Sequence, residues 1–185
     1  LLNAIIHAHD SDAGVKFLDD FTRLSIAACT SLGFTTGIDD LDISDEAVSD
    51  IREANEVTLA HVEEELAVYE SAKGDLRKYE VRPGHTMRDT VEKNIMYMLD
   101  AGNQQAGDIA KSELIYSKES NASSIMAISG ARGSMDNLNM MAGSIGQVKL
   151  RRKRIERGYR ERVLPHFKRG GYGGIERGFI QGALK

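Results

Sequence analysis

The chain has 185 residues, of which 41% are hydrophobic and 6% aromatic, with no tryptophan and two prolines. This composition allows a hydrophobic core and favours helix over sheet. The single cysteine, Cys29, excludes an internal disulfide; because it lies in an apolar run, we expect a buried, unreactive thiol in a reducing compartment. No apolar run approaches the roughly 18 residues that a membrane span needs. Residues 1–7 lack the features of a signal peptide and of a start methionine, so we expect an excised segment.

The charge is distributed unevenly along the chain. The net charge is −4, yet residues 149–185 carry 12 Lys/Arg against 3 Asp/Glu, which leaves the first 148 residues strongly acidic. Acidic helices followed by a basic tail predict that the tail faces phosphates or an acidic partner. A solvated charged surface is the alternative interpretation.

Residues 1–32 are predicted to form two helices separated near residues 11–14. In the second helix, Phe17, Phe21 and Leu24 recur at helical spacing and should supply its apolar side. Gly33 is placed to cap this helix at its C-terminus. The β-prone residues 34–38 predict a short strand or an extended link.

A long helix is predicted from the N-cap Ser44, which two acidic residues follow, to about Ala72. Its apolar stripe is narrow, as expected for packing against one other helix, and consists of Val48, Ile51, Asn55, Thr58, Val62, Leu66 and Tyr69. Glu63, Glu64 and Glu65 fall mostly off the stripe. We therefore expect them to lie in water and not to bind a metal ion.

A second long helix should begin near Thr86, where Asp89 completes a weak capping box, and should reach about Leu114. Gly102 and Gly107 lie inside it and allow a bend or a close backbone approach. Two long helices with a short connector should pack as an antiparallel hairpin. At about 1.5 Å per residue the first would span roughly 40 Å. We therefore expect a mainly α fold with a protruding helix hairpin, short helices and a small irregular or β portion.

Two patterns bear on binding chemistry. The turn at residues 130–133, ahead of a short helix at 135–145, is suited to hold an anion on free backbone amides beside Arg132. The tract 149–169 has ten Lys/Arg among its 21 residues, interleaved with aromatics, and predicts phosphate contact. Pairing of these arginines with acidic surface in a larger assembly is the alternative. Neither a metal-ligand spacing, nor a phosphate-binding loop, nor a Ser–His–Asp set is recognisable.

Eight short blocks stand out when they are taken together: residues 33–40, 129–134, 137–138, 141–143, 146–147, 153–155, 164–167 and 177–179. Their order and spacing resemble the largest subunit of multi-subunit DNA-directed RNA polymerases, in the form called archaeal A-prime. The resemblance implies a fragment of the pore and funnel region. Residues 1–38 would end the pore domain, and 39–148 would form a funnel domain with the helix hairpin. Residues 149–185 would be a basic, glycine-rich segment leading toward the bridge helix.

The resemblance also implies roles for single residues. Six would line the channel by which nucleotides enter: Arg132, Gly133, Asn137, Gln147, Lys153 and Arg154. Three would support the bridge helix: Arg162, His166 and Phe167. The chain departs from the family pattern at Asn103, Met140, Val148 and Arg152, the last of which is usually glycine. These departures affect contacts of those side chains, while the fold should be unchanged.

By this resemblance the chain would be part of a nucleotidyltransferase that synthesises RNA on DNA in the cytoplasm, associated with the nucleoid. It would form the wall of the secondary channel, where nucleoside triphosphates (NTPs) enter and a transcript-cleavage factor docks. Its partners would be the rest of the largest subunit, the second-largest subunit, and DNA and RNA through the assembled enzyme, with no membrane.

The same resemblance places the catalytic Mg²⁺ and structural Zn²⁺ elsewhere in the subunit. The segment itself should have no cofactor, no metal ligand and no catalytic residue, and should be inactive alone. The alternative functions are a stand-alone helical nucleic-acid-binding protein that uses the basic 149–169 tract and a purely structural helical scaffold.

Overall fold

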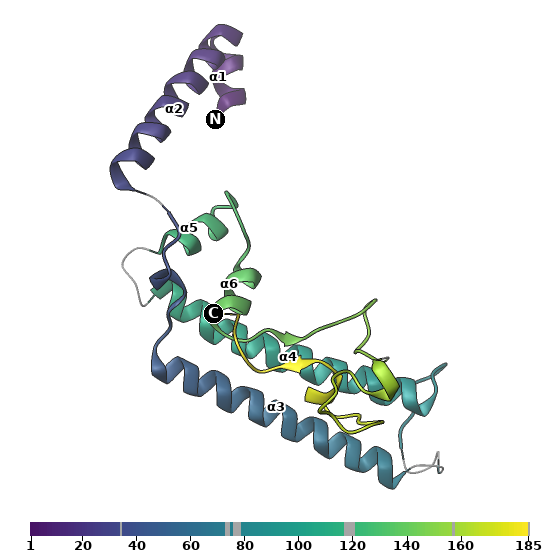
Figure 1. Cartoon of the computed structure of the whole chain (residues 1–185). Coiled ribbons are helices and arrows are strands. Elements are labelled where there is room, and N and C mark those ends of the chain that lie inside the picture. The colour runs from purple at the N-terminus through teal and green to yellow at the C-terminus, as the bar shows by residue number, and fades with distance from the viewer. Residues whose placement is uncertain (34, 73–74, 76–78, 117–120, 157, 185) are drawn as a thin grey trace. The chain divides into compact units, whose positions relative to one another are not determined.

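The computed structural model describes residues 1–33, 35–72, 75, 79–116, 121–156 and 158–184, in two compact units, Leu1–Thr36 and Gly37–Lys185 (Figure 1). The fold is mainly helical with a small two-stranded sheet, which confirms the predicted fold class. Its elements in chain order are α1 (Leu2–Ala8), α2 (Ser11–Leu32), the 3-10 helix η1 (Asp39–Leu41), α3 (Asp45–Ser71), α4 (Met87–Tyr116), α5 (Ala122–Ile128), α6 (Met135–Ala142), β1 (Gly146–Gln147), the 3-10 helices η2 (Tyr159–Glu161) and η3 (Ile175–Arg177), and β2 (Phe179–Ile180).

The first unit consists of α1 and α2, in agreement with the two predicted helices. The break between them falls at His9 and Asp10, slightly before the predicted position. It falls there because the Asp10 carboxylate accepts a hydrogen bond from Ala13 N (2.7 Å) and caps α2. Gly33 ends α2 in the left-handed conformation (φ 62°), and its N–H donates to the Cys29 carbonyl. The predicted C-terminal cap is confirmed.

The apolar side of α2 has the predicted helical spacing, but its side chains are largely exposed. Phe21 is 57% exposed, while Phe17 is half-buried and stacks on it. The short α1 covers α2 near Gly14, where an added Cβ would lie 2.8 Å from Ile6 Cγ1. Seven residues of α1 are too few to cover a helix of 22. For the same reason Cys29 is a free, exposed thiol and not the buried one that we expected.

In the second unit, α3 and α4 form the predicted antiparallel hairpin (Figure 1). The Ser44 hydroxyl accepts a hydrogen bond from Ala47 N at 3.2 Å and caps α3. Ahead of α4, Thr86 Oγ1 accepts from Asp89 N (3.1 Å) while the Asp89 carboxylate accepts from Thr86 N (3.4 Å), which makes a reciprocal capping box. The Thr86 hydroxyl also donates to the Asp89 carboxylate (2.7 Å), and this bond, followed by the one from Thr86 N, holds the pKa of the Asp89 carboxyl below its usual value. Both predicted helix starts are thereby confirmed.

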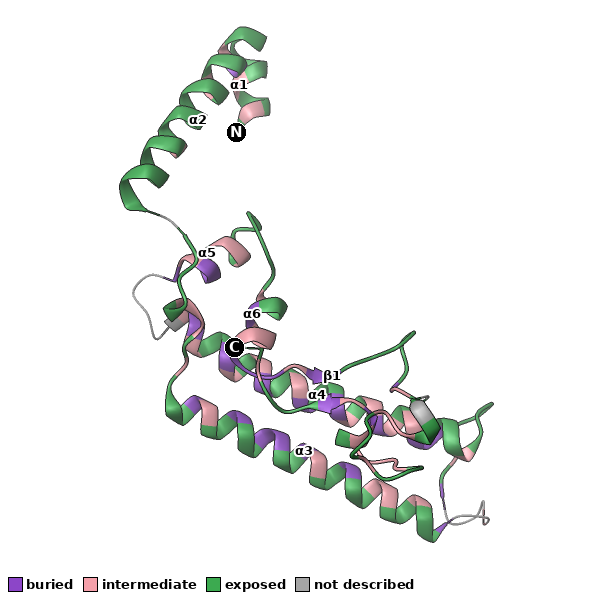
Figure 2. Ribbon diagram, viewed as in Figure 1, coloured by how far each residue is buried: buried purple, intermediate pink, exposed green. Residues whose placement is uncertain are grey.

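A narrow apolar core runs between α3 and α4, as the buried positions along both helices in Figure 2 show. Val62 of α3 and Ile95 of α4 are fully buried in it, and Phe179 of β2 packs against the same cluster. The two backbones approach closely at Gly102, where an added Cβ would overlap the side chain of Thr58. The predicted stripe of α3 is confirmed, and Gly102 serves the close approach.

Tyr79 fastens the connector between α3 and α4 to both helices. Its hydroxyl donates to the Glu65 carboxylate, and the Asn94 amide donates to Glu65 (2.9 Å) and to the Tyr79 oxygen (3.0 Å). Burial, together with the neighbouring carboxylate, raises the pKa of Tyr79 to about 12. The expectation that Glu65 lies free in water is therefore wrong, whereas Glu63 and Glu64 are exposed as predicted.

After α4 the chain returns along the hairpin. Leu138 and Ala142 of α6 pack on Leu114 near the end of α4. β1 and β2 then pair antiparallel, with Gln147 opposite Phe179. The sequence analysis did not anticipate this pairing.

A short strand or an extended link was predicted at residues 34–38. Residues 35–38 form no strand, which leaves the link, and Phe34 lies outside the described residues.

One half-buried carboxylate holds the C-terminal segment on α4. The guanidinium of Arg154 donates to both oxygens of Glu92, at 2.9 and 3.2 Å, and the Arg154 side chain is 0% exposed. Arg154 also donates to the carbonyls of Gly173 (3.3 Å) and Tyr172 (3.0 Å). Arg177 Nη1 lies 3.7 Å from the same carboxylate, and its guanidinium sits 4.1 Å from the Tyr172 ring centroid. Two buried cations thus share Glu92.

Replacing Tyr79 by phenylalanine removes the hydroxyl that links the connector to α3 and α4. We expect the unfolding free energy of the chain to fall by about 1–2 kcal/mol at neutral pH, measured by urea denaturation. The pKa of Tyr79 is raised from 10.0 to about 12 in the folded chain. The contribution of the neutral hydroxyl is therefore complete below pH 10 and lost as the pH rises toward 12. The difference between parent and variant should shrink over that range.

The matched control is Tyr97→Phe, at a position where the residue is 73% exposed. It should change the unfolding free energy by less than about 0.5 kcal/mol. Equal losses in the two variants would mean that the Tyr79 hydroxyl makes no specific contribution.

Replacing Glu92 by glutamine leaves Arg154 and Arg177 buried without a counter-charge. We expect the unfolding free energy to fall by about 3 kcal/mol or more in the same urea assay. The control is Asp100→Asn, which breaks the ion pair with Lys149. In this pair the side chain of Asp100 is 45% exposed and that of Lys149 is 39% exposed. That change should cost less than about 1 kcal/mol. A loss no larger in Glu92→Gln than in the control would contradict the central role of this cluster.

Candidate functional site

The residues predicted to line a channel fall into two separate groups. One group, around Arg154, lies beside the first half of α4, where Glu92 is its partner. The other, around Arg132, lies between α5 and α6, which pack near Leu114 at the end of α4. Glu92 and Leu114 are 22 residues apart in one helix, which corresponds to about 33 Å. The structure therefore does not bring the two groups into one pocket.

Lys153 and Arg154 are adjacent in sequence but have different surroundings. Arg154 is buried against Glu92 and cannot contact a ligand without breaking that pair. Lys153 is exposed. The two hydrogen bonds from Thr86 are the main causes of the lowered pKa of Asp89, and the positive charge of Lys153 is a smaller one. Of the two predicted contacts, only Lys153 is placed to meet a ligand from solvent.

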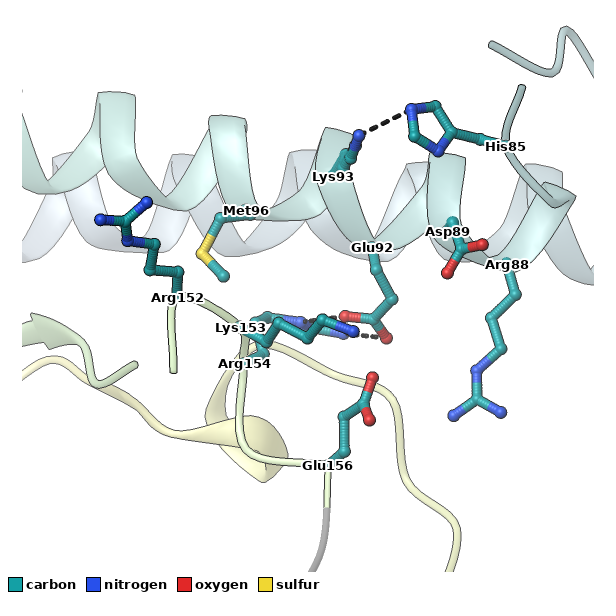
Figure 3. A pocket seen from close by; sticks show the side chains of 10 residues that line it. All are labelled: His85, Arg88, Asp89, Glu92, Lys93, Met96, Arg152, Lys153, Arg154 and Glu156. Carbon is teal, nitrogen blue, oxygen red and sulfur yellow. Dashed lines mark hydrogen bonds and ion pairs between the residues drawn. The ribbon is translucent and has the colours of Figure 1, made fainter. Parts of the chain in front are cut away.

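A pocket of about 400 Å³ opens between the start of α4 and the segment that carries Lys153 (Figure 3). Lys93 donates to His85 Nε2 at 2.8 Å on one side of it. The pocket is lined by His85, Arg88, Asp89, Glu92, Lys93, Met96, Arg152, Lys153, Arg154 and Glu156. Five of these residues carry a permanent positive charge and three are carboxylates, so the lining is basic.

Gln147 has a structural environment. It is buried in β1, and its amide nitrogen donates to the carbonyls of Val148 (2.7 Å) and Arg177 (2.9 Å). Its Oε1 is buried without a hydrogen-bond partner among the described residues. Gln147 therefore ties β1 to η3 and is not presented to solvent.

Arg132 lies in an exposed turn between α5 and α6, next to Gly133, whose φ is +79°. The predicted set of free amides in this turn is wrong, because three of them are already bonded. Gly130 N donates to Ala127 O, and the amides of residues 131 and 132 both donate to Met126 O. The exposed guanidinium of Arg132 remains available to an anion.

Asn137 lies on the exposed side of α6, and its backbone N–H donates to the Ser134 hydroxyl at 3.3 Å as part of the helix cap. Its side chain belongs to no pocket that Lys153 lines.

The three residues predicted to support the bridge helix lie in the irregular segment after η2. His166 is exposed, and its ring centroid lies 4.2 Å from that of the half-buried Phe167. Arg162 is half-buried, and its Nε has no hydrogen-bond partner among the described residues. These three side chains are presented by turns, one of which is closed by the bond from Gly170 N to Glu161 O (3.0 Å).

Metal-ligating side chains do not gather anywhere in the described part of the chain: no three His, Cys, Asp or Glu residues there lie close enough to hold a metal ion. Within the same described ranges, none of the helices combines the length and apolar character that crossing a membrane requires.

Glu92 is the functional residue that the sequence analysis missed. Its signal is its position, three and seven residues before the buried Ile95 and Leu99, which places a carboxylate on the buried face of α4. A lone acid on a buried helix face requires a partner. The basic tract 149–169 is the source of that partner, but spacing alone does not identify Arg154.

Comparison with known proteins gives a family match. Residues 72–180 match the family described as RNA polymerase Rpb1, domain 4. The chain is 40% identical over 185 residues to the DNA-directed RNA polymerase subunit Rpo1N of Methanocaldococcus jannaschii and equally similar to that of Thermococcus celer. It is 36% identical over 181 residues to the Rpo1N subunit of Halobacterium salinarum.

These alignments cover the whole of this chain for the first two relatives and 98% for the third. They cover 13%, 20% and 18% of the three relatives, so the chain spans a fifth or less of their length. The matched residues 72–180 contain α4, α5, α6, both strands and the Glu92–Arg154–Arg177 cluster, which together make up most of the second unit. Because this match extends over more than half of its residues, the chain belongs to the RNA polymerase Rpb1 domain 4 family.

Proposed function

We propose that this chain is part of a DNA-directed RNA polymerase and forms a wall of the secondary channel through which nucleotides enter. The observation that carries the proposal is the placement of positive charge. Glu92 neutralises the buried Arg154, while Lys153 and the distant Arg132 stay exposed on the surface of the second unit. The similarity to an archaeal Rpo1N subunit extends over all 185 residues, which supports the assignment to an RNA polymerase.

Nucleoside triphosphates are anions, and exposed cations along a route raise their local concentration. Arg132 suits such a role because its turn is otherwise closed by backbone hydrogen bonds and presents the side chain to solvent. Lys153 offers a second cation near the other end of α4. In this proposal Gln147 and Arg154 act indirectly, by holding the wall in shape.

The α3–α4 hairpin is the proposed docking element for a transcript-cleavage factor. The segment with Arg162, His166 and Phe167 is the proposed support for the bridge helix. The rest of the largest subunit and the second-largest subunit are the proposed partners, and magnesium-dependent chemistry belongs to them, because the described residues of this chain offer no metal-ligand set.

A stand-alone nucleic-acid-binding protein that uses residues 149–169 is supported less well. Arg154, one of the ten cations of that tract, is buried and bonded internally and so is withdrawn from such binding. The matched relatives are also subunits of an enzyme, by the names that they carry.

Replacing Arg132 by alanine in the assembled polymerase should raise the apparent KM for NTPs by about two- to fivefold, since one exposed ionic contact contributes up to about 1 kcal/mol. The kcat should be nearly unchanged, because the contact is made before the reaction. Steady-state RNA synthesis at varied NTP concentration measures both constants. The control, Arg52→Ala on the exposed part of α3, should leave KM unchanged. An unaltered KM in Arg132→Ala would remove this residue from the route.

The 185-residue chain alone should not extend an RNA primer on a DNA template, even with Mg²⁺ and all four NTPs, because its described residues form no metal-ligand cluster. Gel analysis of labelled primer measures this, with the assembled polymerase as the positive control. Synthesis by the chain alone, free of contaminating enzyme, would overturn the proposed division of roles.

A further inference from the structure

The pocket at the start of α4 has a composition that its proposed role in the channel wall does not explain. Two elements that are far apart in sequence supply its free cations: α4 contributes Arg88 and Lys93, and the basic segment contributes Arg152 and Lys153. Figure 3 shows the lining side chains, with Lys93 turned toward His85 and with Arg152 and Lys153 on the segment beside α4. Its volume of about 400 Å³ lies within the range of roughly 300–1,000 Å³ of small-molecule sites.

The acidic residues of the lining neutralise its cations only in part. Glu92 is already bonded to Arg154 and approached by Arg177, so it has no charge to spare for the opening. Asp89 accepts two hydrogen bonds from Thr86 in the helix cap and keeps its negative charge, so it offsets one of the cations. Glu156 is the remaining carboxylate of the lining. The opening therefore faces solvent with excess positive charge.

Arg152 is held at the pocket by a strained turn. Arg151 and Arg152 both have positive φ, 53° and 65°, a conformation that favours glycine. The turn is closed on both sides, because Leu150 N donates to Lys153 O (2.8 Å) and Lys153 N donates to Leu150 O (3.1 Å). Two successive non-glycine residues in this conformation are unusual, and strain of this kind clusters at functional sites.

We propose that this pocket binds the polyphosphate group of a small anion, either the triphosphate of a nucleotide or free pyrophosphate. A single carboxylate would satisfy one or two of the cations, whereas a chain of phosphates presents several charged oxygens to arginine and lysine from both elements. The proposal deepens the proposed nucleotide route and rests on it for the source of the anion. In this proposal the ligand contacts Arg88, Lys93, Arg152 and Lys153. It does not contact Arg154, which was predicted to line the channel.

The test measures protection of single lysines in the assembled polymerase. The acetylation rates of Lys93 and Lys153 by a small acylating reagent are followed by mass spectrometry while inorganic triphosphate is added. Both rates should fall severalfold as the pocket fills. The rate at Lys149, which is paired with Asp100 outside the pocket, should not change. Because the readout is local, polyphosphate bound elsewhere in the enzyme does not affect it.

Two variants at neighbouring positions distinguish a contact inside the pocket from a general loss of positive charge. Arg152→Gly removes a lining cation and also relieves its positive φ, so the fold is not endangered. It should raise the triphosphate concentration for half-protection by about tenfold. Arg151→Gly makes the same backbone and charge change at a residue that does not line the pocket, and should shift that concentration by less than about twofold.

The remaining arms identify the source of the anion and the outcomes that overturn the proposal. Protection by ATP at lower concentration than by inorganic triphosphate assigns a nucleotide; equal protection, with pyrophosphate also active, assigns free polyphosphate. Protection by an oligoglutamate peptide without any by triphosphate would show an acidic protein segment as the occupant and overturn the proposal, as would no protection at all. If the lysines are unprotected while Arg132→Ala still raises KM, the pocket proposal fails and the nucleotide route stands.

Discussion

The second unit depends on one carboxylate. Glu92 lies on the buried side of α4 and compensates two guanidiniums, Arg154 and Arg177, that come from opposite ends of a basic, glycine-rich segment. Burying two cations is unfavourable unless both are paired and hydrogen-bonded, and here carbonyls of Gly173 and Tyr172 take up further donors of Arg154. The segment has little regular structure of its own, so this pairing, with Phe179 packed in the core, sets its course along the hairpin.

The same pairing divides the cations into those that are buried and hold the fold and those that are exposed to solvent. A tract that is uniformly basic in sequence becomes, in the fold, a buried arginine next to exposed cations. Arg152 and Lys153 are aimed at solvent by a turn whose backbone is strained, and α4 places Lys93 and Arg88 opposite them. Where the resemblance leads one to expect glycine at 152, this chain has a cation in a glycine-like conformation. The lining of the pocket comes from residues that the hairpin and the segment contribute jointly.

Several features could be predicted from residue patterns because local interactions determine them. The caps at Ser44 and Thr86 and the left-handed Gly33 are fixed within a few residues. The stripe of α3 follows from helical periodicity. Other features could not be predicted this way. The exposure of the apolar α2 face is one of them, since periodicity reports which side is apolar and not whether a partner covers it. The prediction of free amides near Arg132 is wrong because backbone hydrogen bonding within a turn depends on the conformation of the turn.

The sequence by itself determined the mainly helical fold, the two long helices and their limits, and the membership that its ordered blocks indicate, because these rest on local propensity and spacing. Only the tertiary structure decided which cations are buried and which are exposed. It also decided that Tyr79 bonds Glu65, that Gln147 pairs with a distant strand, and that Arg132 and Lys153 lie apart. The physical reason is that burial and charge pairing depend on contacts between residues far apart in sequence, about which local patterns carry no information.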